Sequence, residues 1–441
     1  MTALLDPVTV PIGYVGTPRL LRMPDLFEFD AHLAAHGALP ALDRPALLSL
    51  LDAVHLTGRG GAGFPLAAKL RALRSGPEPV VVINGAEGEP ASAKDRALLG
   101  WVPHLVLDGA QLLATAVGAR RCLVAISDPA LAASLRQVLA CRPEFQLAGS
   151  HRTGRSVTGR SVAGRSAAGR SAAGGFELHA VPDRFVAGEA RALIAALNGG
   201  PAAPPGRRVL PTDRGIGGQP TLLCNAETLA QLAVLARLGP AAFGSVGTPT
   251  EPGGTLLTVS GAVRSPGVLE VPLGTRLGTV AAAVGALPSQ AVVIGGYHGG
   301  WLAPNPELEL SRAGLTAAGG TLGAGVLIFV GEQTCPLAEL ARVAGWLAGQ
   351  SVRQCGPCTF GLPALAGELT RLAAGRGEAG NAARIAGLLP GRGACAHPDG
   401  ASRFVRSGLA ALAGEVHLHR AYGSCRRPDL GHLATARRVW S

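Results

Sequence analysis

The spacing of apolar residues changes twice along the chain and divides it into three regions. From about residue 45 to 240, short apolar runs alternate with helix-like stretches rich in alanine and leucine. The runs at 80–83 and 123–126 predict buried strands, and residues 129–139 predict a helix after the second strand. This alternation is typical of an α/β layer fold.

The other two regions follow residue 250. The stretch LLTVSGAVRSPGVLEVPL predicts a β-hairpin that turns at Pro266 and Gly267. From Cys335 onward, apolar residues recur at three- and four-residue spacing, which predicts helices. We therefore expect four parts: an α/β domain over 1–240, a β-rich domain over 250–330, a helical domain over 335–415 and a polar tail over 416–441.

A repeat interrupts the first domain. Residues 153–175 read TGRSV, TGRSV, AGRSA, AGRSA and AGG, without an apolar face. Such a segment cannot pack against a core, so we expect a flexible insert over 151–175. Its Gly-Arg-Ser units could contact an acidic partner, but a loop expanded without function is the simpler interpretation.

The composition narrows the class of protein. The chain has 441 residues, 47% apolar and 16% charged, which suits two or three globular domains and excludes a disordered polyelectrolyte. The net charge is +11, yet only two of the 40 basic residues are lysines, and the arginines are scattered among few aromatic residues. We therefore expect no nucleic-acid binding.

Several features predict a cytoplasmic protein. Eight cysteines are too sparse for a disulfide scaffold in a chain of this length. The N-terminal stretch MTALLDPVTVPIG lacks the pattern of a signal peptide. The uncharged run at 313–331 indicates a loop and a strand, so no direct membrane span is expected.

Four glycines within six residues form the first candidate site. GRGGAGFP occupies residues 58–65, and Lys69 follows four positions later. This loop exposes backbone N–H groups, and a helix that begins near Pro65 would add its N-terminus and the Lys69 ammonium, which suits phosphate. A tight turn is the simpler alternative, and no good strand precedes the loop as a dinucleotide fingerprint requires.

Polar residues follow the strand at 80–83 directly. NGAEGEPASAKDR occupies residues 84–96 and contains the second lysine. The carboxyl end of a strand in an α/β sheet is a usual ligand position. Asn84 can supply amide hydrogen bonds there, and Glu87 and Glu89 can bind ribose hydroxyls. A solvated acidic loop is the alternative.

Cysteines form the third candidate site. Cys355 and Cys358 follow a predicted helix, and Cys395 lies 37 residues beyond Cys358. Two thiolates at this spacing can bind one face of a metal or cluster, and a distant cysteine can complete it. Three cysteines are one fewer than a structural zinc or a cubane cluster takes, and a CxxC redox pair is the alternative.

Taken in order, these motifs resemble the flavin- and NADH-binding subunit of bacterial complex I. This family includes the corresponding subunits of NAD-reducing hydrogenases and NAD-dependent formate dehydrogenases. The resemblance extends over roughly residues 45–415, and four segments carry it most clearly: 58–69, 84–96, 185–193 and 218–228.

The resemblance implies a fold and an activity. The fold is an α/β FMN-binding domain, then a soluble-ligand-binding β-grasp domain, then a C-terminal helical iron–sulfur bundle. The activity is that of an NADH dehydrogenase-like oxidoreductase, in which hydride passes from NADH to FMN and single electrons pass to the cluster. The implied partners are other subunits of an electron-transfer complex, including a ferredoxin-like protein, with the chain peripheral on a membrane complex.

The resemblance also implies the residues of the site. Those around FMN and NAD(H) are Gly58, Arg59, Gly60, Gly61, Ala62, Gly63, Phe64, Lys69, Asn84, Glu87, Glu89, Gly188, Glu189, Asn225 and Thr228. Within this set, Glu87 and Glu189 face the nicotinamide nucleotide. The cluster ligands are Cys355, Cys358 and Cys395.

The chain departs from the family in its cluster motif. The family has Ser-Cys-Gly-x-Cys-x-x-Cys, and this chain has Val352 at the first cysteine. Because valine cannot bind iron, we expect either a 4Fe-4S cluster with another ligand or an incomplete cluster. Cys335 and His397 are the nearest candidates in sequence for that ligand.

The nucleotide site departs as well. Ala86, Ala190 and Cys224 stand where the family has polar residues, and of the aromatic residues around the adenine only Phe64 remains. A non-catalytic or ferredoxin-linked paralogue, retained as an assembly or docking subunit with eroded sites, is therefore the alternative function.

The other cysteines and histidines suggest no further site. Cys122 and Cys141 are expected to pack within the α/β layer, and Cys425 is interpreted as incidental. His417 and His419 would share one face of a strand, but no third ligand with metal spacing accompanies them.

Overall fold

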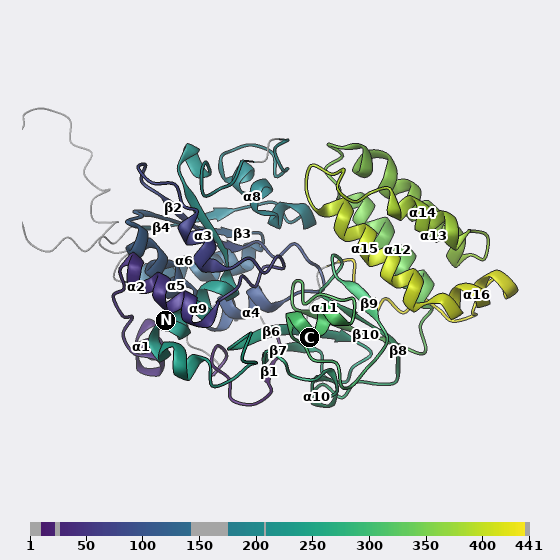
Figure 1. The fold of residues 1–441 in the computed structure, drawn as a ribbon, viewed down its shortest axis with the longest axis horizontal. Coiled ribbons are helices and arrows are strands. Elements are labelled where there is room, and N and C mark those ends of the chain that lie inside the picture. Colours follow the sequence, from purple (N-terminus) through teal and green to yellow (C-terminus); the bar gives the residue numbers. More distant parts are fainter. Residues whose placement is uncertain (1–9, 23–26, 143–174, 207–208, 437–441) are drawn as a thin grey trace, which may run out of the picture.

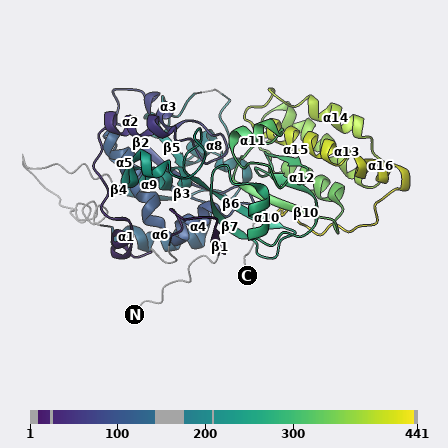
Figure 2. The ribbon, with the colours of Figure 1, turned by 60° about the horizontal axis from the view of Figure 1, so that its bottom comes forward.

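The computed structural model describes residues 10–22, 27–142, 175–206 and 209–436. Two sheets and a helical bundle follow one another along its longest axis, with the first sheet and the bundle at opposite ends (Figures 1 and 2). Residues 151–174 of the expected flexible insert lie outside the described part of the chain, and residue 175 begins a strand.

The first sheet is parallel and has four strands in the order β4-β3-β2-β5. Their bounds are β4 (Gly175–Ala180), β3 (Arg121–Ile126), β2 (Val80–Gly85) and β5 (Thr221–Asn225). Both strands expected from the apolar runs are therefore present. The chain moves from β2 outward to β3 and β4 and then returns to the other side of β2, which creates a topological switch point between β2 and β5.

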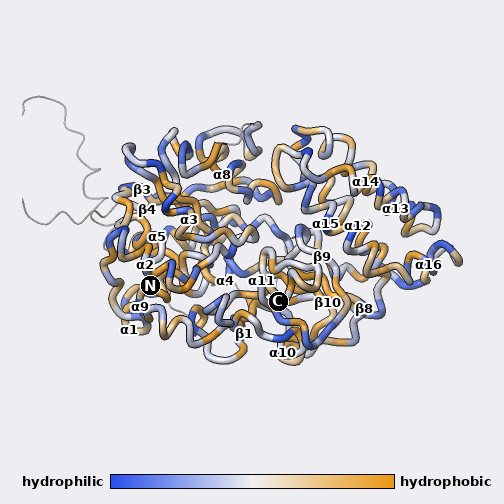
Figure 3. The backbone as a smooth tube through the Cα atoms, viewed as in Figure 1, coloured by the Kyte–Doolittle hydropathy of each residue, from blue (hydrophilic) through white to orange (hydrophobic). Residues whose placement is uncertain are grey.

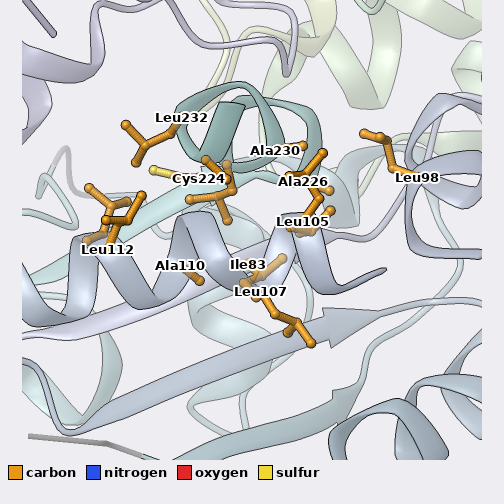
Figure 4. Packing of buried hydrophobic residues seen from close by; sticks show 14 of the residues in the cluster. Ile83, Leu98, Leu105, Leu107, Ala110, Leu112, Cys224, Ala226, Ala230 and Leu232 are labelled. Carbon is orange, nitrogen blue, oxygen red and sulfur yellow. The ribbon is translucent and has the colours of Figure 1, made fainter. Parts of the chain in front are cut away.

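Alternate residues of β2 point to opposite sides of this sheet. Val81 and Ile83 belong to the core under the larger layer of helices, while Val80 and Val82 belong to a smaller core under α8. Figure 4 shows Ile83 with Leu105 and Ala230 from the larger layer. The helices of this domain are α1 (Phe29–His36), α2 (Arg44–Val54), α3 (Leu66–Arg71), α4 (Lys94–Trp101), α5 (Pro103–Val117), α6 (Pro129–Cys141), α8 (Ala190–Leu197) and α9 (Ala226–Phe243), with 3₁₀ turns η1 (Phe185–Gly188) and η2 (Ile216–Gly218).

The second sheet is mixed and has six strands in the order β1-β7-β6-β10-β8-β9. Their bounds are β1 (Ile12–Tyr14), β7 (Gly267–Pro272), β6 (Gly254–Gly261), β10 (Val326–Gly331), β8 (Ser289–Ile294) and β9 (Gly300–Leu302). The expected hairpin is confirmed, because β6 and β7 pair antiparallel with Val259 opposite Gly267. The expectation that the whole of 1–240 belongs to the α/β domain is wrong, because β1 pairs parallel with β7.

Each face of the second sheet has its own core. Leu257 and Leu327 pack on one face with α10 (Leu277–Ala283) and α11 (Arg312–Ala317). Val293 and Ile328 pack on the other face against the C-terminal helices. This sheet therefore joins the two ends of the molecule.

The C-terminal region is a bundle of helices. Its elements are α12 (Pro336–Gln350), a π-helical turn (Pro357–Gly361), α13 (Leu362–Ala373), α14 (Ala379–Gly387), α15 (His397–Ala411) and α16 (Ala413–Tyr422). Hydrophilic stretches lie at the outer ends of α13 and α16 (Figure 3). The polar tail expected from residue 416 is wrong: α16 extends to Tyr422, and the chain then packs back so that Leu433 is fully buried.

Within the described chain, no single helix has both the length and the hydropathy to cross a membrane. The helices α4 and α5 reach these values only as a pair, and the two axes differ in direction by 95°.

Candidate functional site

The predicted site residues converge at the carboxyl ends of β2 and β5. Asn84 and Asn225 are register partners on these neighbouring strands, at the switch point of the sheet. Asn225 is also the N-cap of α9, where its side chain accepts a hydrogen bond from the Glu227 N–H. Two residues that are far apart in sequence therefore present amide groups side by side at the usual ligand position of a parallel sheet.

The glycine loop lies against this pair of strands. Gly61 and Gly63 have φ of +103° and +63°, which favour glycine. A Cβ on Gly63 would lie 1.9 Å from a guanidinium nitrogen of Arg312, and a Cβ on Gly60 would lie 3.2 Å from the Cβ of Asn225. A side chain at Gly63 would therefore displace the Arg312 guanidinium, and one at Gly60 would require a small shift of Asn225.

The loop has an outward side that can bind an anion. Among the described residues, no protein acceptor is hydrogen-bonded to the N–H groups of Gly60, Gly61, Ala62 or Gly63. Consecutive N–H groups of this kind can bind an anion. Phe64 follows them and is 52% exposed, so an aromatic face is available beside them.

Arg59 anchors the loop from its inward side. Its N–H donates to Thr228 Oγ1 at 2.9 Å, and its buried guanidinium donates to Thr57 and to the Gly254 carbonyl. The guanidinium also lies 3.8 Å from a carboxylate oxygen of Glu227. The Arg59 side chain therefore faces the protein core and fixes the loop, while Thr228 supplies the acceptor.

Lys69 brings a cation to the same edge of the sheet. It lies in α3, which follows the loop with Pro65 as its N-cap, as the sequence predicted. Its Nζ donates to the Leu223 carbonyl of β5 at 2.7 Å. Because β5 is an edge strand, this carbonyl is free of the ladder on its outer side, and the half-buried ammonium is held near the glycine loop.

The loop after β2 is built from carboxylates that bind N–H groups of this chain. Glu87 accepts hydrogen bonds from the N–H groups of Asp95 and Arg96 at the start of α4, and from the Ser92 hydroxyl. Burial and then the nearby Asp95 carboxylate raise the pKa of Glu87. Glu89 accepts from the Tyr297 N–H at 2.8 Å, which ties this loop to the second sheet.

A buried network lies beneath the site. Lys94 Nζ lies 2.7 Å from Asp95, 3.0 Å from Asn225 Oδ1 and 3.3 Å from Glu227, while Asn225 Nδ2 donates to Asp95 at 2.6 Å. Burial acts to lower the pKa of Lys94, but Asp95 and Glu227 outweigh it, and the pKa is raised. The ammonium therefore stays charged and fixes the orientation of the Asn225 amide.

Gly188 and Glu189 approach from the segment before α8. The Gly188 carbonyl accepts from Asn84 Nδ2 at 3.1 Å, which places this segment against β2. Glu189 is the N-cap of α8 and accepts from the Arg191 and Ala192 N–H groups. Its carboxylate also lies 3.1 Å from the Arg191 side chain, so its charge is partly neutralised.

Arg191 connects this segment to the cysteine loop. Its guanidinium donates to the Ala394 carbonyl, the residue before Cys395, at 3.0 Å. A cavity of about 330 Å³ opens here, lined by Arg191, Val209, Leu210 and the loop at 391–399. The predicted nucleotide side and cluster side of the molecule are therefore neighbours.

An aromatic group fills the space beside this connection. Phe185, three residues before Gly188, has ring centroids of His298, Trp346 and His397 within 4.6, 5.2 and 5.6 Å. These side chains come from three regions of the chain. They hold the bundle against the segment that carries Gly188.

Cys355, Cys358 and Cys395 lie near one another at the C-terminal end of α12. Burial is the main cause that raises the pKa of Cys358 to about 12, and the thiols of Cys355 and Cys395 contribute. Cys358 is 2% exposed, and the other two are half-buried. This arrangement offers three thiolates to one metal centre.

Neither sequence candidate for the fourth ligand is placed to bind at the cluster loop. His397 uses both ring nitrogens, with Nε2 2.9 Å from the Leu347 carbonyl and Nδ1 3.1 Å from His298. Cys335 precedes α12, and the 15 residues of this helix extend over about 22 Å. The two candidates that were nearest in sequence therefore do not replace the cysteine at Val352.

Sequence reasoning missed the groups that come from distant elements. Arg312 donates to the Gly58 carbonyl at 3.1 Å across 254 positions, and Asp95 and Glu227 complete the Lys94 network. No local spacing marks such contacts. The signal that was present in sequence was Lys94 itself, one of only two lysines.

Comparisons with known proteins agree with this geometry. The family described as Nuo51 FMN-binding domain matches residues 51–234. The family described as NADH-ubiquinone oxidoreductase-F iron-sulfur binding region matches residues 338–419. The two ranges contain the glycine loop and the three cysteines, respectively.

Similar proteins cover almost the whole chain. The second F-type subunit of the NADH-quinone oxidoreductase of Rhizobium meliloti (strain 1021) is 30% identical over 434 residues, covering 94% of this chain and 97% of its own. The F-type subunit of the Escherichia coli (strain K12) enzyme is 27% identical, covering 86% and 85%. The structure of an NAD⁺-reducing [NiFe]-hydrogenase in the H₂-reduced state superimposes with a TM-score of 0.77 at 29% identity, covering 94% of this chain and 68% of that one.

Proposed function

Because the chain belongs to the family of F-type subunits of NADH-quinone oxidoreductase, we propose that it binds FMN at the carboxyl ends of β2 and β5. It is an NADH dehydrogenase-like oxidoreductase subunit that transfers electrons from NADH through FMN to an iron–sulfur centre. The observation that carries this function is the convergence of the free N–H groups of residues 60–63 with Lys69, Asn84 and Asn225.

The residues fit the phosphate and the ring of FMN. The N–H groups at 60–63 and the Lys69 ammonium hold the phosphate, since both bind anions without a side-chain acceptor in competition. Asn84 and Asn225 lie at the strand ends beside the proposed ring position, and their amides fix the surrounding loops through Gly188 and Lys94. When bound, FMN accepts hydride and releases electrons one at a time.

Fewer side chains are available to bind the nicotinamide nucleotide than to bind FMN. Phe64 offers an exposed aromatic face to the nucleotide, and Glu189 reaches the same side with a carboxylate already bound to N–H groups and to Arg191. Ala86 and Ala190 supply no polar group. These features predict weaker discrimination among electron donors than a fully polar pocket would give.

The cysteine loop fits three of the four ligands of a cubane. Cys355, Cys358 and Cys395 would hold the centre, and the position of Val352 leaves one corner without a ligand from the described chain. A bound iron–sulfur centre supplies one-electron transfer. Arg191, which contacts both Glu189 and the Ala394 carbonyl, keeps the two sites adjacent.

The second sheet is assigned to a domain of the same family. We assign residues 250–330 to the soluble-ligand-binding β-grasp domain of the family, which the six-stranded mixed sheet with α10 across one face supports. The chain acts beside other subunits of an electron-transfer complex, with a ferredoxin-like protein among the candidates. We place it in the cytoplasm, peripheral to a membrane complex.

Anaerobic purification followed by visible spectroscopy tests the function. We expect flavin bands with a broad iron–sulfur shoulder, both bleached by NADH. Arg71 lies in the same helix as Lys69, and its side chain forms an exposed ion pair with Asp52 of α2. The variant Arg71→Ala removes a cation away from the proposed phosphate position and should show the wild-type spectrum. A colourless protein that cannot be reconstituted with FMN and iron would instead identify a non-catalytic docking subunit.

A further inference from the structure

A second group of ligand side chains lies at the other end of α12. Cys335 is the N-cap of this helix, and Glu415 and His419 lie one turn apart on α16. Cys425 follows α16 in the returning C-terminal segment. The ligand atoms of all four residues lie within 4.8 Å of one another, and no other group of His, Cys, Asp and Glu in the described ranges does so.

The histidine is oriented as a metal ligand would be. His419 Nδ1 lies 2.7 Å from the Ala373 carbonyl, so this nitrogen is the donor. Its Nε2 then faces the group, 3.5 Å from the Cys335 sulfur and 3.1 Å from Glu415. Metal-binding histidines typically donate the opposite ring N–H to a carbonyl in this way, which fixes both the tautomer and the ring.

The charges of the group favour a cation. The Cys425 N–H donates to His419 Nε2 at 3.2 Å, and the Glu415 carboxylate lies 3.1 Å from the same nitrogen. A metal ion at Nε2 would take the place of this hydrogen bond and would also neutralise the carboxylate. Two thiolates, one carboxylate and a divalent ion leave one net negative charge. Arg427, which forms an ion pair with Glu415, offsets that charge.

The spacing suits one ion and not a cluster. Tetrahedral Zn²⁺ binds Cys, His and carboxylate ligands at about 2.0–2.3 Å, which requires neighbouring ligand atoms to be close together. The sulfurs of Cys355, Cys358 and Cys395 do not all lie within 4.8 Å of one another in the described chain, whereas the ligand atoms of the second group do. Mixed sulfur, nitrogen and oxygen ligands also favour zinc over magnesium or calcium.

We propose that Cys335, Cys425, His419 and Glu415 bind a structural Zn²⁺ ion. Each cysteine binds as a thiolate, so entry of the ion releases two thiol protons to solvent. Four protein ligands leave no position for a reacting water, and Cys335 and His419 are almost fully buried. The site is therefore structural and separate from the flavin and iron–sulfur chemistry.

The ion would fasten the returning C-terminal segment to the bundle and the second sheet. The Cys335 N–H donates to the Pro428 carbonyl at 2.7 Å, and the Gly331 N–H donates to His432 at 3.2 Å. Arg427 donates to Gln290 of β8 at 3.0 Å. Zinc at Cys425 would join these contacts to the starts of α12 and α16.

Elemental analysis of the full-length protein tests the site. Zinc, iron and FMN are measured on the same anaerobically purified samples, and the wild type is expected to hold about one zinc per chain. The variants Cys425→Ser and His419→Gln should lose most of the zinc while FMN is retained. The controls are His417→Gln, an exposed histidine on the same helix, and Cys141→Ser, an exposed cysteine, and both should keep it.

Cobalt binding to the wild type keeps the test independent of variant folding. Chelator-treated wild-type protein should take up one Co²⁺ and show a thiolate-to-cobalt charge-transfer band, which added Zn²⁺ removes. A wild type that contains no zinc and takes up neither ion would overturn the proposal. Equal zinc loss in His417→Gln and His419→Gln would overturn it as well. FMN reduction by NADH is unaffected by either result and tests the proposed function separately.

Discussion

The glycine-loop site and the cluster loop differ in how strongly the chain holds them. At the glycine loop, Arg59, Asn84 and Asn225 each form a hydrogen bond to a different element, so three elements hold the site in place. In the cluster loop, Val352 cannot bind iron, and Arg353 has φ of +53° where the family motif has glycine. The residues that surround the proposed flavin position therefore keep more of the family pattern than the residues of the cluster loop do.

The largest effect is expected at Lys94. The variant Lys94→Met removes the buried cation between Asp95 and Glu227 and leaves only Arg59 beside Glu227, so we expect the free energy of unfolding to fall by about 3–5 kcal/mol. The exposed pair of Arg121 and Glu177 provides the control, since Arg121→Met should cost less than about 1 kcal/mol. Urea denaturation measures both, and equal losses would show that the buried network stabilises the fold no more than an exposed ion pair does.

The next effect concerns FMN affinity. The variant Lys69→Gln removes the ammonium beside the glycine loop, and losing one charge-assisted hydrogen bond of about 1.5–3 kcal/mol weakens FMN binding roughly 10- to 100-fold. Fluorescence titration of the FMN-free protein measures the Kd. Arg71→Ala is the matched control from the same helix. If Lys69→Gln binds FMN as tightly as the control, the phosphate lies elsewhere.

The half-buried Glu89 should make the stability of the protein depend on pH. Burial raises its pKa from 4.5 to about 7, so the folded protein holds a proton that the unfolded chain releases between these values. The free energy of unfolding therefore falls as pH rises through this window. Because the carboxylate is half-buried, we expect Glu89 to account for about 2 kcal/mol of this fall. The variant Glu89→Gln, which cannot titrate, should show a fall that is smaller by this amount. Thermal unfolding at pH 5 and pH 8 compares the two proteins. Identical pH slopes would contradict the assignment.

The smallest effect is expected in the cluster loop. Arg353→Gly relieves a left-handed conformation and should raise the free energy of unfolding by up to about 1 kcal/mol. Arg426→Gly, at φ of +59° outside this loop, should give a similar increase without changing the iron content. A loss of stability in Arg353→Gly would show that the arginine makes a favourable contact in the folded protein.

The sequence predicted the local parts of the site well. The strand at 80–83 and the helix after Pro65 could be predicted because each depends on short-range spacing, whereas Cys395, 37 residues beyond Cys358, was assigned to the cluster through the family resemblance. The inward direction of Arg59 could not, since it depends on Thr228 and Gly254 across long stretches of chain. The interpretation of Cys425 as incidental also relied on sequence neighbours and missed Cys335, 90 positions earlier.

Sequence spacing also failed to indicate which histidines near the C-terminus are buried. The spacing of His417 and His419 would place both on one face only if this segment were a strand. They lie in α16, so His417 is exposed and His419 is buried against Ala373 and Cys335. A two-residue spacing separates side chains on a helix, which is why the local pattern gave no sign of the metal-ligand group.

FMN and iron content per chain, measured on anaerobically purified protein beside the variant Val352→Cys, tests most directly whether one chain holds both a flavin site and a three-cysteine iron–sulfur centre. We expect about one FMN in both proteins, with about three irons in the wild type and about four in the variant. Absence of FMN and iron from both proteins, even after reconstitution, would contradict this expectation.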